Sequence, residues 1–140
     1  MFRTIVVGTD GSSTAAIAVD QAGELASALG ATVHVLSAYA GAVRPEEGFG
    51  SRQRIADAPI EVANAAAERL RAHGVESVVV DRAEGGDPAE AILDLAERIN
   101  ADLIVVGNKG VSGIRRFLLG SVAQKVVAHA PCGVLVSRTT

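Results

Sequence analysis

A segment rich in glycine and basic residues, residues 107–122, is the part of the sequence best suited to hold a ligand. It reads GNKGVSGIRRFLLGSV and lies between an apolar run and a helical pattern. Glycines allow the backbone to approach a ligand and to turn its N–H groups towards an anion. Gly120 and Ser121 stand at the start of the helical pattern, and the first turn of a helix favours phosphate through its free N–H groups and its dipole. The segment therefore predicts a phosphate-binding loop.

Local charge separates this hypothesis from that of a plain turn. Glycine-rich turns often follow strands, and serine often opens a helix only as a cap. This loop also carries Lys109, Arg115 and Arg116, although the whole chain has a formal charge of −3. Glycines, a helix start and local positive charge coincide here, which favours phosphate binding over a plain turn.

Short runs of β-branched residues alternate with helical patterns along all 140 residues. The predicted strands are residues 4–8, 32–38, 75–80, 102–107 and 133–137, and helices begin near residues 13, 57, 87 and 121. This alternation is typical of βαβ units, so the predicted fold class is α/β, with a five-stranded parallel sheet and helices on both faces. The length suits one domain spanning residues 1–140. Ligands bind at the carboxyl edge of such a sheet, where the glycine-rich loop begins.

Residues with known capping behaviour mark the ends of the helices. Gly30 follows the first helical pattern, where a left-handed residue is expected. Asp87 and Pro88 form an N-cap and a first-turn proline. Residues 41–57 are rich in Gly, Pro and charge, so they predict one long loop, with Pro59 opening the second helix.

The glycines of the phosphate-binding loop have a recognisable spacing. Gly107-x2-Gly110-x9-Gly120-Ser121 resembles the G-x2-G-x9-G-[S/T] nucleotide motif of the universal stress protein family, with every specified position present. The segments ADLIVVG, LLGSVAQKV and HAPC around it also resemble the family, as does VVGTDGS near the start. The resemblance covers the whole chain. It implies a Rossmann-like fold of the adenine nucleotide alpha hydrolase type, with strand order 3-2-1-4-5.

The resemblance also implies roles for individual residues. Thr9 and Asp10 would line the adenosine site, with the Asp10 carboxylate accepting from ribose hydroxyls, and Ala38 would offer backbone groups to adenine. The other positions are Val106 and Gly107 along the nucleoside, and Gly110, Gly120, Ser121 and Val122 at the phosphates. The implied ligand is ATP or another adenine nucleotide, with Mg²⁺ assisting; cyclic AMP is an alternative. Asn108 stands where many members have His, and it is expected at the rim of the site.

Composition argues against several other ligands and locations. The chain has no basic excess, three Phe, one Tyr and no Trp, which disfavours nucleic acid as a partner. No apolar run reaches the roughly 18 residues of a membrane span, and the start lacks a signal-peptide pattern. Cys132 is the single cysteine and cannot form an internal disulfide, which suits the cytoplasm.

Other nucleotide and phosphate folds fit less well. Asp10 and Asp81 follow strands, as in a phosphoacceptor receiver domain, but Asp10 lacks the acidic neighbour needed for Mg²⁺. Asp81 is therefore expected to be a solvated residue at a strand end. The GxGxxG fingerprint of dinucleotide folds and the P-loop are both absent. Residues 9–13, TDGSS, also differ from the corresponding loop of adenylating relatives of this fold.

Residue types that could act in catalysis are scarce. Cys132 has only His129 near it in sequence and is expected to be a spacer rather than a nucleophile. His34 is expected on a sheet face and His73 at a helix end facing water, and none of the histidines belongs to a metal-ligand pattern. No general base stands out, so slow or absent ATP hydrolysis is expected.

Two classes of function remain. The first is a regulatory, stress-response protein that binds an adenine nucleotide. The second is a nucleotide-free module that only dimerises. Both are compatible with a homodimer, because residues 133–137 form an apolar, uncharged strand that the family's strand order places at the sheet edge. Family members commonly pair this strand with its two-fold mate, which implies a homodimer through the fifth strand.

Overall fold

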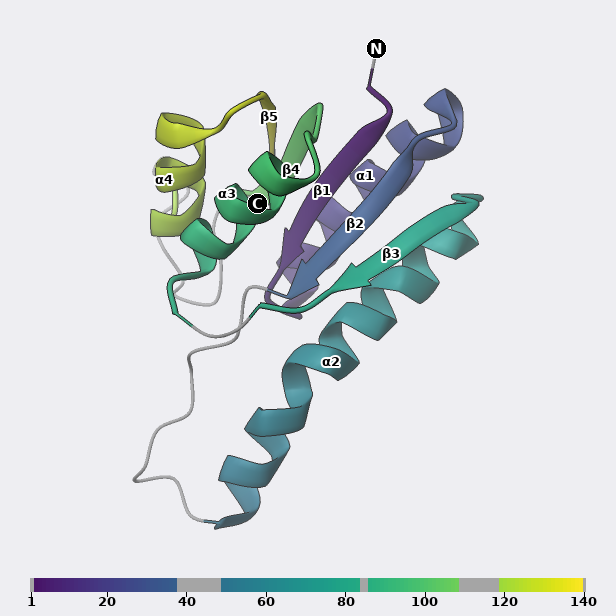
Figure 1. The fold of residues 1–140 in the computed structure, drawn as a ribbon. Coiled ribbons are helices and arrows are strands. Elements are labelled where there is room, and N and C mark those ends of the chain that lie inside the picture. Colours follow the sequence, from purple (N-terminus) through teal and green to yellow (C-terminus); the bar gives the residue numbers. More distant parts are fainter. Residues whose placement is uncertain (1, 38–48, 84–85, 109–118, 140) are drawn as a thin grey trace.

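The computed structural model describes residues 2–37, 49–83, 86–108 and 119–139, with residues 49–59 described by their backbone alone. Five parallel strands form one sheet in the order β3-β2-β1-β4-β5 (Figure 1). The strands are β1 (Thr4–Thr9), β2 (Thr32–Ser37), β3 (Ser77–Asp81), β4 (Leu103–Gly107) and β5 (Gly133–Ser137). The predicted fold class and strand order are confirmed.

Four helices cover the two faces of the sheet. They are α1 (Ser13–Leu29), α2 (Phe49–Ala72), α3 (Pro88–Arg98) and α4 (Ser121–His129). Helices α1 and α2 pack on one face, and α3 and α4 pack on the other (Figure 1). No helix in the described ranges is long and apolar enough to span a bilayer.

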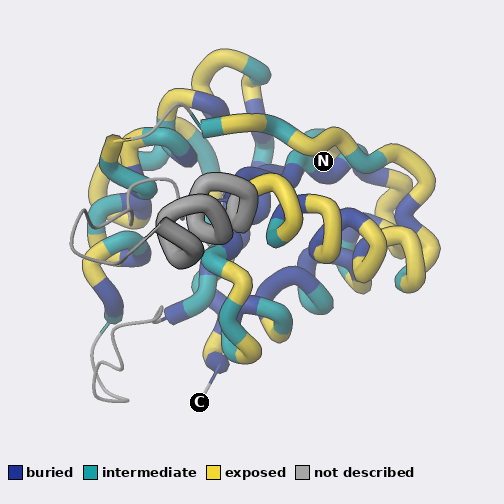
Figure 2. The backbone as a smooth tube through the Cα atoms, turned by 90° about the horizontal axis from the view of Figure 1, so that it is seen from below, coloured by how far each residue is buried: buried dark blue, intermediate teal, exposed yellow. Residues whose placement is uncertain are grey.

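The central strands are buried on both sides because alternate residues point to opposite helix layers. Val7, Val35 and Val105 belong to the cluster against α1 and α2. Val6 and Ile104 belong to the cluster against α3 and α4. Figure 2 shows the same division along the backbone, with buried positions on the inner sides of the helices and exposed positions on their outer turns.

The predicted helix signals at Gly30 and at Asp87 with Pro88 act as expected, and Ser12 is a further cap that was not predicted. The Ser12 hydroxyl accepts from the Ala15 N–H at 3.1 Å and caps α1, and Gly30 ends this helix at a φ of 68°. Asp87 caps α3 through the Ala89 N–H at 3.3 Å, and Pro88 is the first helical residue. These groups satisfy backbone positions that a helix end leaves without partners.

The start of the second helix was predicted wrongly. Helix α2 begins at Phe49, so residues 49–57 are helical and not part of a long loop, and Pro59 lies inside the helix. Residues 51–56, SRQRIA, include good helix formers that the Gly and Pro residues around them obscure in the sequence. A proline inside a helix removes one backbone hydrogen-bond donor. Helix α2 continues for several residues on each side of Pro59, and it tolerates this loss at some cost in stability. Residues 41–48 of the predicted loop lie outside the described residues.

Helices α1 and α2 are joined by an ion pair on their outer side. The Asp20 carboxylate of α1 accepts from the Arg69 guanidinium at 2.6 and 2.9 Å, and the His73 imidazole lies 3.0 Å from the same carboxylate. His73 was expected to face water, so this contact corrects the prediction. The hydrogen bond from Arg69 lowers the pKa of the Asp20 carboxyl; burial opposes this effect, and the contact with His73 adds to it.

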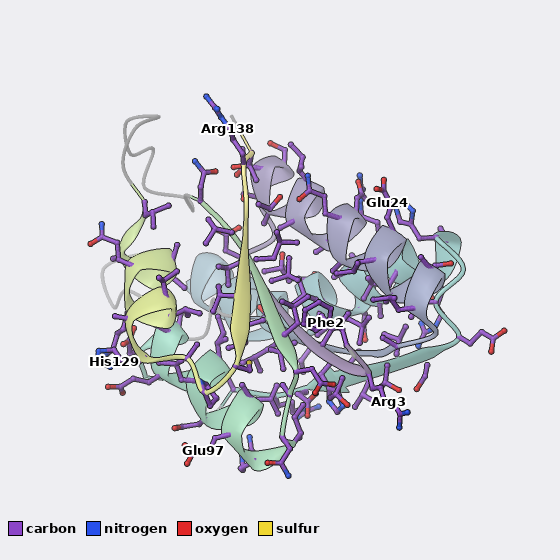
Figure 3. The ribbon with its side chains drawn as sticks, turned by 90° about the horizontal axis from the view of Figure 1, so that it is seen from above. Phe2, Arg3, Glu24, Glu97, His129 and Arg138 are labelled. Atoms are coloured by element: carbon purple, nitrogen blue, oxygen red, sulfur yellow. The ribbon has the colours of Figure 1, made fainter. Side chains whose placement is uncertain are left out.

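We predict that Asp20→Asn destabilises the protein only where this carboxylate is ionised. Because the pKa of Asp20 is lowered on folding, its contribution is complete above the unfolded value near 4 and is lost as the pH falls through the folded value. Urea unfolding at pH 7 should show a loss of about 0.5–1 kcal/mol for this partly exposed pair, and a smaller loss at pH 3, below the unfolded pKa. The matched control is Glu24→Gln, an exposed carboxylate on the same helix (Figure 3). An equal loss at both pH values would contradict the prediction.

Candidate functional site

The carboxyl ends of β1 and β4 meet at one edge of the sheet. The two strands are neighbours, with Val7 opposite Val105, and β2 lies on the other side of β1. The chain therefore leaves β1 and β4 towards different helix layers from adjacent positions. Such a switch in strand order opens a crevice in which α/β proteins bind ligands.

The start of β1 and the start of β4 are tied together at the opposite edge. The Asp102 carboxylate accepts from the backbone N–H groups of Arg3 and Thr4 at 2.8 and 2.9 Å. These two hydrogen bonds lower the pKa of the Asp102 carboxyl. The contact fixes how β1 lies against β4, and hence where their carboxyl ends meet.

The turn after β1 is held by its own side chains. The buried Thr9 hydroxyl accepts from the Gly11 N–H at 3.2 Å, and the Asp10 carboxylate accepts from the Ser12 N–H at 2.9 Å. Asp10 is partly exposed, and only one of its oxygens makes this bond. A carboxylate has further acceptor capacity on both oxygens, so Asp10 can also accept from a ligand.

The start of α4 differs from the starts of α1 and α3. Gly120 is the N-cap residue, with φ −65° and ψ 164°, and no side chain caps the helix. The Gly120 N–H donates to the Asn108 backbone carbonyl at 2.7 Å. The side-chain amide of Gln124 donates to the Leu119 backbone carbonyl at 2.6 Å. These contacts hold the end of the loop beside the end of β4. Among the residues that the structure describes, no side chain caps the first N–H groups of α4, and free N–H groups at a helix start favour an anion.

Asn108, which was expected at the rim of the site, is buried, and its side chain contacts Thr139. Its side-chain oxygen accepts from the N–H and the hydroxyl of Thr139, at 2.9 and 2.7 Å. Both residues are 7% exposed. The backbone N–H of Asn108 donates to the Ser137 carbonyl at 2.9 Å, which extends the contact between β4 and β5.

Comparison with known proteins assigns the family. The model of the universal stress protein family matches residues 1–138. The chain belongs to this family. A universal stress protein of Mycobacterium tuberculosis is 38% identical, and the match covers 99% of this chain and 98% of the relative.

Two solved structures of universal stress proteins carry adenine nucleotides. One, in complex with cAMP, has a TM-score of 0.78 and 34% identity, and the match covers 99% of each chain. The other, from Archaeoglobus fulgidus in complex with dAMP, has a TM-score of 0.71 and 25% identity, covering 96% of this chain and 97% of that one.

Seven of the nine residues predicted for the site of this universal stress protein are described. They are Thr9, Asp10, Val106, Gly107, Gly120, Ser121 and Val122, and the fold brings them to the β1–β4 edge and the start of α4. Ala38 and Gly110 lie outside the described residues. Val106 is 3% exposed and belongs to the cluster against α3 and α4.

Ser37 is a residue of the same edge that the sequence prediction missed. It lies opposite Thr9 in the β1–β2 register, and its buried hydroxyl has no hydrogen-bond partner among the described residues. Its signal in the sequence is weak, because a small polar residue at a strand end is common.

A cavity of about 320 Å³ between α1 and α2 adjoins Thr9, Gly11 and Ser12.

The residues considered for other chemistry have structural roles. Asp81 was expected to be solvated, but its carboxylate lies 2.8 Å from the His34 imidazole on the neighbouring strand. Burial raises the pKa of the Cys132 thiol, and nearby Asp102 adds to this, which disfavours the reactive thiolate. Within the described ranges, no group of three or more His, Cys, Asp or Glu side chains could hold a metal ion.

We predict that Gly11→Ala destabilises the protein more than the same substitution does at a left-handed glycine with open space around it. Gly11 has a φ of 83°, and a Cβ atom there would lie 2.7 Å from the Val62 side chain. Gly30→Ala is the matched control, because Gly30 has a φ of 68° with nothing within 4 Å. We expect losses of roughly 2–3 kcal/mol at Gly11 and about 1 kcal/mol at Gly30 in urea unfolding. Equal losses would show that the contact with Val62 is unimportant.

Proposed function

We propose that this universal stress protein binds an adenine nucleotide, ATP or a close relative, at the β1–β4 edge and acts as a nucleotide-dependent regulator in the stress response. The observation that carries the proposal is the start of α4. It presents N–H groups that no described side chain caps, beside the carboxyl ends of two central strands. The partly exposed Asp10 carboxylate belongs to the same edge.

The chemistry of these groups suits the parts of a nucleotide. Asp10 would accept from the ribose hydroxyls, with Thr9 beside it and the Ala38 backbone at the adenine edge. Val106 and Gly107 would lie along the nucleoside. The N–H groups at Ser121 and Val122 would donate to phosphate oxygens, together with the Gly110 and Gly120 backbone of the family motif. Mg²⁺ would reach the site bound to the phosphates.

Cyclic AMP is the second candidate ligand, since a similar universal stress protein has been solved in complex with cAMP. Both candidates share adenosine and at least one phosphate, so both would use Asp10 and the start of α4. They differ in the number of phosphates and in the free ribose hydroxyls. Calorimetric titration of nucleotide-stripped protein with ATP, ADP, AMP and cyclic AMP, each with and without Mg²⁺, ranks them. Absence of binding by all four would favour the nucleotide-free dimerisation module.

We predict that Asp10→Ala weakens the binding of ATP and GTP by the same factor. Both nucleotides carry the same ribose, so a carboxylate that holds the sugar cannot distinguish them. Loss of one or two hydrogen bonds to a charged group corresponds to roughly 1.5–3 kcal/mol, a decrease of about ten- to hundredfold in affinity. Unchanged ATP affinity in a folded variant would exclude this role. A loss confined to ATP would instead place Asp10 at the base.

We also propose a homodimer paired through β5. This strand lies at the sheet edge, and Leu135 is 36% exposed on it. Seen from above in Figure 3, β5 is the foremost strand, between α4 and α1, running from the side of His129 towards Arg138. An apolar edge strand offers N–H and C=O groups for pairing, and a two-fold contact between identical strands is self-complementary.

We predict that Leu135→Lys shifts the protein from dimer to monomer. The two-fold axis would bring the two lysines close together, and like charges on paired strands are unfavourable. Light scattering and sedimentation at micromolar concentration measure the change. Val127→Lys, at an exposed apolar position on α4, is the control for added charge away from the strand. A parent protein that is already monomeric at this concentration would contradict the β5 dimer.

A further inference from the structure

Asn108 occupies a junction between three parts of the chain. Its backbone carbonyl accepts from the N-cap residue of α4, Gly120, at 2.7 Å. Its backbone N–H donates to the Ser137 carbonyl at the end of β5. Its side-chain oxygen holds Thr139, two residues after β5. Residues 108 and 120 lie near the two ends of the glycine-rich segment, and the hydrogen bond between them brings these ends together.

The side chain of Asn108 is oriented by the groups around it. A backbone N–H can only donate, so the Thr139 N–H requires the oxygen, and not the nitrogen, of the Asn108 amide. With the Thr139 hydroxyl as second donor, both lone pairs of this oxygen are used. The oxygen therefore has no remaining acceptor capacity for a ligand, and Asn108 can influence a ligand through this atom only indirectly.

We propose that Asn108 and Thr139 form a positioning pair for the phosphate end of the site. The hydrogen bonds of Thr139 fix the Asn108 side chain, the Asn108 carbonyl fixes Gly120, and Gly120 sets where the first N–H groups of α4 point. This inference rests on the proposed nucleotide site, and it adds a residue beyond β5 to the control of that site. Donors act on a ligand only when they are held within a fraction of an ångström, so a small displacement of Gly120 weakens phosphate binding.

The positioning role predicts a difference between ligands with and without phosphate. Adenosine would contact Thr9 and Asp10 after β1 and the last residues of β4, Val106 and Gly107, whereas ATP also needs the start of α4. Loss of the Asn108–Thr139 contact should therefore weaken ATP and leave adenosine nearly unchanged. A general loss of stability would weaken both ligands or neither.

The decisive comparison is Thr139→Val against Thr139→Ser. Valine keeps the shape of threonine but removes the hydroxyl, whereas serine keeps the hydroxyl that donates to Asn108. We expect Thr139→Val to weaken ATP roughly three- to tenfold and adenosine less than twofold, and Thr139→Ser to bind both like the parent. Asp20→Asn, on the far side of α1, controls for loss of stability alone.

A second variant tests the partner of Thr139. Asn108→Leu has a similar size but no acceptor, so it should weaken ATP about tenfold or more if it folds. Because the two side chains act together, the double variant Asn108→Leu/Thr139→Val should be no worse than Asn108→Leu. If Asn108→Leu does not fold, the comparison of Thr139→Val with Thr139→Ser tests the proposal alone.

The outcomes separate the two proposals. If the parent binds neither adenosine nor ATP, the proposed nucleotide site is wrong and the positioning role falls with it. If the parent binds ATP and Thr139→Val binds it as tightly as Thr139→Ser does, the positioning role is wrong and the nucleotide site stands. Equal weakening of adenosine and ATP by Thr139→Val would also overturn the positioning role, because it would show a purely structural effect.

Discussion

The pairing of β1 with β4 is the contact on which the remaining structure depends. Val6 and Val7 of β1 are fully buried towards opposite helix layers, and Ile104 and Val105 of β4 are buried in the same way. Burial of each such side chain contributes roughly 1.5–3 kcal/mol, so any shift of register along this pair would be strongly unfavourable. The hydrogen bonds from Arg3 and Thr4 to Asp102 add a polar restraint at one end. A rigid centre is what lets the turn after β1 and the end of β4 present polar groups at a fixed separation.

The fold class and the site differ in how far the sequence predicts them. Continuous apolar runs and capping residues such as Asp87 report local energetics, so the strands and three helix ends could be predicted from short windows. The start of α2 could not, because Gly and Pro lower helix propensity in a window while the rest of the helix decides the outcome. The motif around Gly120 predicted the end of the glycine-rich loop and the start of α4 correctly, because glycines occur where the backbone geometry requires them.

Long-range polar contacts were beyond sequence reasoning. Asn108 and Thr139 are 31 residues apart, and His34 and Asp81 are 47 apart. Each pair forms because neighbouring strands bring two short polar side chains together, and nothing in either residue alone signals the partner. The same holds for Asp20 with Arg69, which depends on how α1 lies against α2. For this reason the buried contact of Asn108 with Thr139 was not predicted, although the place of Asn108 after β4 was.

Capping chemistry decides where an anion can bind at this edge. Helices α1, α3 and α4 all begin at the carboxyl edge, and each contributes the positive end of a dipole there. Ser12 satisfies the start of α1 and Asp87 that of α3, and Asp87 is in turn paired with Lys125 of α4. At α4 the N-cap residue is a glycine, and none of the side chains in the described part of the chain caps this helix. The overall charge of −3 opposes anions only weakly at this point, because fields from charges beyond about 8–10 Å are largely screened at physiological salt. The net charge of the protein is therefore no argument against the proposed phosphate end at the start of α4, where the N-cap residue Gly120 has no side chain to cap the helix.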